Sequence, residues 1–73
     1  MNSIPFIDGQ IDWVAYHAQR AIEFRDVASG WRETARGLAE TDPQFAVFAV
    51  ARANANDMFA EQAESEARGF KAA

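Results

Sequence analysis

Thr41-Asp42-Pro43-Gln44 is the strongest break in this chain, and it divides the 73 residues into two long segments with helical patterns. Proline is tolerated in the first turn of a helix, where its missing N–H leaves no bond unmade. Thr41 and Gln44 can form a capping box, or Asp42 can cap the helix by itself. Both interpretations start a helix at nearly the same residue. A connection this short predicts an antiparallel hairpin of two helices.

The segment before the break predicts one helix over residues 10–39. Asp8 is a suitable N-cap, because its carboxylate can accept the free N–H groups of the first turn. Gly30 could end the helix, but the apolar spacing continues in phase from Val27 to Trp31, which favours a continuous helix. The apolar stripe follows steps of three and four residues. It consists of Trp13, Tyr16, Arg20, Phe24, Val27, Trp31, Ala35 and Leu38.

The segment after the break predicts a second helix over residues 43–69, with Gly69 as its stop signal. This segment is rich in alanine, the best helix former. Its apolar stripe consists of Phe45, Phe48, Ala49, Arg52, Ala55, Phe59, Ala63, Ala67 and Phe70. Residues 40–43 form the predicted turn. We expect Trp31, Phe45 and Phe48 to meet in one apolar cluster beside it.

Residues 1–9 predict an extended arm, because Pro5 disfavours helix and Asp8-Gly9 is typical of a turn. The arm could fold over the ends of its own helices or strap a neighbouring subunit. The whole chain is then one small all-α domain, because 73 residues leave room for no more. The apolar residues that make the arm adhesive are Ile4, Phe6 and Ile7.

The two stripes carry more large side chains than one helix pair can bury, and soluble monomers rarely expose patches beyond a few hundred Å². A second copy could supply the cover by completing a four-helix bundle. A different protein, or closure of a monomer by the arm, are the alternatives. Arg20 and Arg52 interrupt the stripes and could specify the pairing. The candidate interaction residues are Trp13, Tyr16, Arg20, Phe24, Trp31, Phe45, Phe48, Arg52 and Phe59.

Residue types that support catalysis or cofactor binding are sparse. The chain has no cysteine, which excludes disulfides and cysteine zinc sites. His17 is the single histidine, and no carboxylate lies three or four residues from it, so a metal site on one helix fails. We expect it to be a half-exposed interface residue. Ser29 lies twelve residues from His17 and Ser65 lies among carboxylates, so neither is placed as an activated nucleophile, and the glycines are isolated. The sequence predicts no enzyme, cofactor or metal.

The charged residues form two further groups by helical spacing. An acidic group could be a solvated face or a dock for a basic protein, and it consists of Asp57, Glu61 and Glu64. A basic group could be a solvated face or contact phosphate, and it consists of Arg25, Arg32 and Arg36. The net charge of −4 disfavours nucleic-acid binding, which requires a basic surface.

These patterns predict a small acidic protein-interaction module that is homo-oligomeric and cytoplasmic. The absence of cysteine fits a reducing compartment, the first residues lack signal-peptide features, and no segment approaches the roughly 20 apolar residues of a membrane span. Such a protein would bind another protein as an inhibitor, adaptor or accessory subunit, a profile shared by small phage and mobile-element proteins. The alternatives are a self-assembling structural module and a bundle that sequesters a small ligand.

Overall fold

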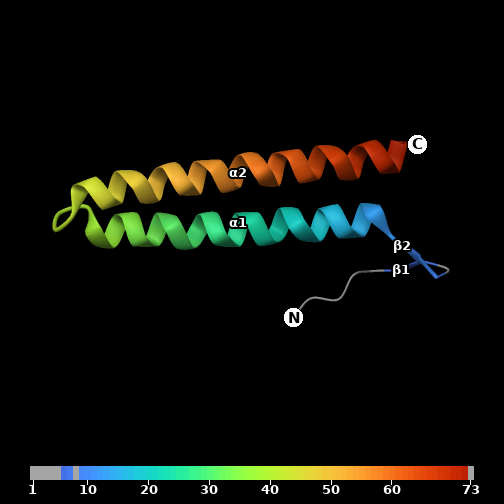
Figure 1. The fold of residues 1–73 in the computed structure, drawn as a ribbon, viewed down its shortest axis with the longest axis horizontal. Helices are drawn as coiled ribbons and strands as arrows, with labels where there is room; N and C mark the ends of the chain where they lie inside the picture. The colour runs from blue at the N-terminus through green and yellow to red at the C-terminus, as the bar shows by residue number, and fades with distance from the viewer. Residues whose placement is uncertain (1–5, 8, 73) are drawn as a thin grey trace.

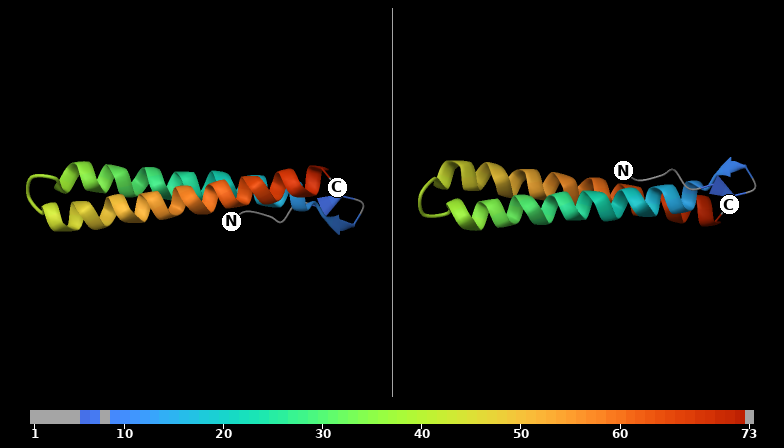
Figure 2. Two further views of the ribbon diagram at one scale, coloured as in Figure 1. Left: turned by 90° about the horizontal axis from the view of Figure 1, so that it is seen from above. Right: turned by 90° about the horizontal axis from the view of Figure 1, so that it is seen from below.

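The protein is an antiparallel hairpin of two long helices in a computed structural model that describes residues 6–7 and 9–72 (Figure 1). Helix α1 spans Trp13–Leu38 and helix α2 spans Pro43–Ala72. The helices lie side by side along their length and cross at a shallow angle (Figure 2). They form a single layer, and the Cα extents of the chain are 52 × 25 × 11 Å. The predicted all-α hairpin is confirmed.

A short β-hairpin precedes α1 at the open end of the helical hairpin, the end that carries both termini of the helix pair. Strands β1 (Phe6–Ile7) and β2 (Gln10–Ile11) pair antiparallel. Gly9 lies in the turn with φ of 76°, a left-handed conformation that glycine adopts without a steric penalty. The predicted arm over residues 1–9 is only partly covered, because residues 1–5 and 8 lie outside the described residues.

Helix α1 begins at Trp13, and Asp12 is its N-cap. The backbone of Asp12 is extended, and its Oδ1 accepts a hydrogen bond from the N–H of Ala15 at 3.1 Å. The prediction that the helix begins at Gln10 is wrong, because Gln10 pairs as a strand residue with β1. The N-cap predicted at Asp8 falls on a residue that is not described, and Asp12 performs that role instead.

Helix α1 runs unbroken through Gly30 and ends at Leu38, so the continuous helix is confirmed and its end lies one residue before the prediction. Asp42 caps α2, because its Oδ1 accepts a hydrogen bond from the N–H of Phe45 at 3.1 Å. The main-chain oxygen of Asp42 accepts the first intrahelical bond, from Ala46 at 3.0 Å. The structure therefore decides between the two capping interpretations in favour of Asp42.

Helix α2 continues through Gly69 to Ala72, so the predicted stop at Gly69 is wrong. A glycine within a helix costs about 1 kcal/mol relative to alanine. The ring of Phe70 stacks on Trp13 and His17, with centroid separations of 6.1 and 5.6 Å. These contacts hold the last turns of α2 against the start of α1, which explains why the helix continues past the glycine.

Every residue that is buried within the described part of the chain is an alanine. On α1 these alanines are spaced by seven residues, and on α2 the spacings are three, four and seven, as in the seam of a coiled coil. Their small side chains allow the two backbones to approach closely. We call this set the alanine seam, and it consists of Ala21, Ala28, Ala35, Ala46, Ala49, Ala53, Ala60 and Ala63.

The predicted stripes coincide with the buried faces of the helices only at Ala35, Ala49 and Ala63. Ala35 is the one member of the α1 stripe that is buried, while Phe24 and Trp31 pack against the seam from the side. Periodicity gives most weight to large apolar residues, whereas two helices at close approach have room only for small ones. The predicted stripe therefore lies beside the face that α1 buries.

Candidate interaction surface

The alanine seam divides the hairpin into two long faces, because residues at opposite offsets from a seam position point to opposite flanks of a helix. On α1, Phe24 and Trp31 lie four residues before and three after Ala28. Arg25 and Arg32 lie three residues before and four after it, on the other flank. Residues of α2 meet each flank, so the hairpin has one aromatic and one charged face.

Charged residues from both helices join across one of these faces, which we call the arginine face (Arg25, Arg32, Asn54, Asp57 and Glu64). Arg25 contacts Glu64, and its Nη1 lies 4.0 Å from Asp57 Oδ1. Arg32 Nη2 lies 2.5 Å from Asp57 Oδ2 and 3.3 Å from Asn54 Oδ1. These side chains are partly exposed, so each ion pair is worth about 0.2–1 kcal/mol. The pairs engage Arg25, Arg32, Asp57 and Glu64 within the hairpin.

The opposite face carries the rings, and we call it the aromatic face (Trp13, Tyr16, Phe24, Trp31, Phe45, Phe48, Phe59 and Phe70). Phe24 from α1 meets Phe59 from α2, with ring centroids 5.4 Å apart. Nearer the turn, Trp31 packs edge-on against Phe48 at 5.9 Å, and Phe48 contacts Phe45 at 5.5 Å. The predicted cluster of Trp31, Phe45 and Phe48 is confirmed.

Five of the eight rings of the aromatic face remain about half exposed. The exposed fractions are 45% for Trp13, 40% for Phe45, 49% for Phe48, 49% for Phe59 and 50% for Phe70. An enclosed aromatic side chain buries about 150–250 Å², so each of these five leaves about 100 Å² uncovered. Their sum of about 500 Å² already matches the largest apolar patch of a typical monomer, about 300–600 Å².

His17 joins the aromatic face near the open end of the hairpin. Its ring stacks on Trp13 at 6.0 Å and on Phe70 at 5.6 Å, and it meets the edge of Tyr16 at 5.3 Å. Its Nδ1 lies 3.1 Å from Glu66 Oε2 on α2. The side chain is only 16% exposed, so the prediction of a half-exposed histidine is wrong. Spacing along α1 could not reveal partners that α2 supplies.

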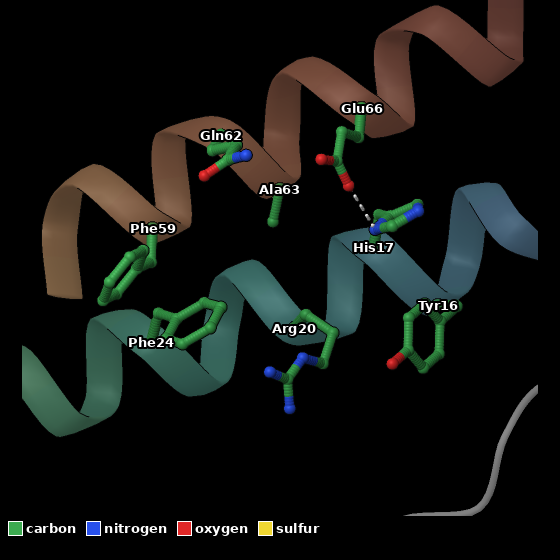
Figure 3. Close-up of a pocket in the computed structure, with 8 residues that line it drawn as sticks. All are labelled: Tyr16, His17, Arg20, Phe24, Phe59, Gln62, Ala63 and Glu66. Atoms are coloured by element: carbon green, nitrogen blue, oxygen red, sulfur yellow. Dashed lines mark ion pairs between the residues drawn. The ribbon is translucent and has the colours of Figure 1, made fainter.

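A groove opens in the aromatic face around Ala63, as Figure 3 shows. The Phe24–Phe59 pair lies at one end, and the His17–Glu66 pair lies at the other. Ala63 points into the gap between them. The groove has a volume of ≈ 270 Å³ and is open to solvent. Tyr16, Arg20 and Gln62 complete its lining.

The two stripe arginines differ in their contacts. The guanidinium of Arg20 lies 4.8 Å from the ring centroid of Phe24, and Arg20 Nη1 lies 3.7 Å from Glu23 Oε2. Arg52 is exposed and lies four residues after Phe48, on the same flank of α2. All nine candidate interaction residues therefore lie on or beside the aromatic face.

The candidate interaction residues left out two members of this surface. Phe70 was predicted only as part of the second apolar stripe, and His17 only as an interface residue without partners on α2. The register of the hairpin supplies the signal that could have found them. The residue numbers of Trp13 and Phe70, and those of Phe24 and Phe59, add to 83 in each contacting pair. The same register brings His17 to Glu66. Once Asp42 and Pro43 fix the turn, this register relates the contacting residues in the open half of the aromatic face.

Within residues 6–7 and 9–72, no group of three histidine, aspartate or glutamate side chains could hold a metal ion. In the same residues, neither helix has a stretch apolar enough to cross a membrane. The chain matches no protein-family model, and comparisons with curated proteins and with solved structures find no match. The aromatic face is therefore the feature on which a function can be argued.

Proposed function

We propose that this chain is a small protein-interaction module that works as a homo-oligomer, with a second copy covering its aromatic face. One hairpin is a single layer of two helices, and domains are built from at least two packed layers. A second hairpin against the aromatic face would complete a four-helix bundle. The oligomer would in turn act by binding another protein, as an inhibitor, adaptor or accessory subunit.

The five half-exposed rings carry this proposal. They leave about 500 Å² of aromatic surface uncovered on each chain. Two copies that pack these faces together would bury about 1,000 Å² from these side chains alone, which is the size at which specific interfaces begin. Interface cores are enriched in tryptophan, tyrosine and phenylalanine, and this face is composed of them.

The charges beside the aromatic face also fit self-association. Each chain carries a net charge of −4, which opposes the approach of two copies. Four charged side chains border this face among the described residues, namely Arg20, Arg52, Glu23 and Glu66, and their charges sum to zero. The repulsion therefore comes from the outer surfaces, where salt screens it. We expect added salt to strengthen the assembly rather than dissolve it.

The test is light scattering on a sizing column over a range of micromolar concentrations. One variant combines Phe48→Ser with Phe59→Ser on the aromatic face. The matched control combines Val47→Ser with Met58→Ser, whose side chains are 70% and 69% exposed but are not members of the aromatic face. We expect the wild type and the control to be oligomers and the aromatic-face variant to be a monomer. Circular dichroism checks that all three chains remain helical.

Two outcomes contradict the proposal. A wild type that stays monomeric at every concentration removes the homo-oligomer. A control that dissociates as readily as the aromatic-face variant moves the interface to another surface. Native mass spectrometry of protein purified from its own source then addresses the wider role. A second protein that stays bound supports a binding function. An assembly of this chain alone favours the alternative of a self-assembling structural module.

A further inference from the structure

The groove around Ala63 is a hollow in an otherwise ring-covered face. The wall at one end is the Phe24–Phe59 pair, and the wall at the other is the imidazole of His17. Its volume of ≈ 270 Å³ falls below the range of about 300–1,000 Å³ that small-molecule pockets occupy. A hollow of this size, with rings beside it and polar side chains at its rim, is suited to one large side chain.

We infer that this groove receives Phe48 of a second copy, in a two-fold dimer whose hairpins run antiparallel with their turns at opposite ends. This inference rests on the proposed homo-oligomer and specifies its geometry. Phe48 is 49% exposed and stands on the turn half of the aromatic face, whereas Ala63 stands on the open half. Each copy then supplies one ring and one groove, as a two-fold interface requires.

The axial positions of the two residues fit this arrangement. The midpoint between Phe48 and Ala63 along α2 falls between Ala55 and Asn56. The midpoint of Pro43–Ala72 lies only two residues away, about 3 Å along the helix. A two-fold axis at Ala55 therefore places Phe48 of each copy over the groove of the other while the hairpins overlap along nearly their whole length.

The same axis pairs other residues that complement one another. On α2, Arg52 and Phe59 are centred on the same midpoint, so Arg52 of one copy faces the exposed Phe59 ring of the other. An arginine over an aromatic ring is attracted to it, and Arg20 already makes this contact with Phe24 within one chain. The exposed Arg52 thereby gains a partner in the dimer.

On α1 the corresponding midpoint lies between Val27 and Ala28, at the same level in the hairpin register. Phe24 and Trp31 are centred there, so Phe24 of one copy meets Trp31 of the other. A parallel dimer with both turns at one end fits less well. It places the groove of one copy opposite the groove of the other, so that neither groove is filled and Phe48 does not meet a groove on the other copy.

The experiment uses the absence of cysteine in the chain, which permits one spin label at Thr41→Cys in the turn. In the antiparallel dimer the two labelled turns lie at opposite ends, with backbones about 44 Å apart at 1.5 Å per residue. Pulsed electron paramagnetic resonance should give one long distance. A mixture of chains labelled at Thr41→Cys and Gly69→Cys should add a short distance, because Thr41 then faces the open end of the other copy.

A second measurement tests the ring itself. Phe48→Ala should raise the dimer dissociation constant at least tenfold, while the neighbouring control Val47→Ala should leave it nearly unchanged. A dimer that gives a short distance between Thr41→Cys labels overturns the antiparallel geometry but leaves the proposed homo-oligomer standing. Equal effects of Phe48→Ala and Val47→Ala also overturn the ring-in-groove contact. A chain that stays monomeric removes the proposed function and this inference together.

Discussion

Replacing Ala53 with leucine tests whether the alanine seam holds the helices at close approach. Ala53 is fully buried, and leucine adds three carbon atoms to it. If there were free space between the helices at this position, burial of these carbon atoms would stabilise the fold by about 0.8 kcal/mol for each one. At a closed seam they must separate the helices or force strained rotamers, which costs about 1–3 kcal/mol. We expect the second result, because small residues alone occupy the seam.

The matched control is Ala51→Leu, on the exposed side of the same helix. Leucine and alanine have similar helix propensities, so the difference between the two variants reports packing. Urea denaturation followed by circular dichroism should give Ala53→Leu a free energy of unfolding about 1–3 kcal/mol below that of Ala51→Leu. Both variants are measured at one chain concentration, because the stability of an oligomer depends on it. An Ala53→Leu variant as stable as the control would refute the close seam.

Three further predictions use the same denaturation assay. Asp42→Ala should lower the free energy of unfolding by about 0.5–2 kcal/mol because it removes the cap of α2, and a comparable loss in Thr41→Ala would contradict this assignment. Gly30→Ala should raise stability by about 0.5–1 kcal/mol, because nothing beyond its own helix turn lies within 4 Å of the added Cβ and alanine favours helix. Asp57→Asn should cost about 0.2–1 kcal/mol for each of its two arginine pairs, more than Glu61→Gln, and the difference should shrink at high salt. A difference that persists in salt would show that packing rather than charge is lost.

The hairpin could be predicted from sequence because the features that build it are local. Pro43 and the carboxylate of Asp42 act within one turn of the residues they organise. The apolar spacing from Val27 to Trp31 is also a local signal, and it predicted that the helix continues across Gly30. The start of α1 was less predictable, because two strand residues compete with helix at Gln10 and Asp12 is an equally good cap further along.

The partition of side chains between the two faces could not be predicted in the same way. Arg25 and Glu64 are 39 residues apart in sequence, so helical spacing alone cannot show that they pair. The seam was hidden because alanine is apolar but small, and each seam alanine has a larger neighbour that dominates the periodic pattern. Identification of the seam requires the register of both helices together, and that register follows from contacts that only the folded hairpin displays.

The seam also explains why no rearrangement within one hairpin can hide the rings. Rotation of both helices to turn Phe24 and Phe59 inward would increase the distance between the helix axes. This distance is usually about 8–10 Å and grows with the size of the side chains at the contact. That movement would open the seam and separate Arg25 from Glu64. Alanines form the contact between the two helices of the chain, and the aromatic side chains of both helices are left on one flank. We therefore expect the bundle to be rectangular in section, with a narrow separation inside each chain and a wider, ring-filled separation between the copies.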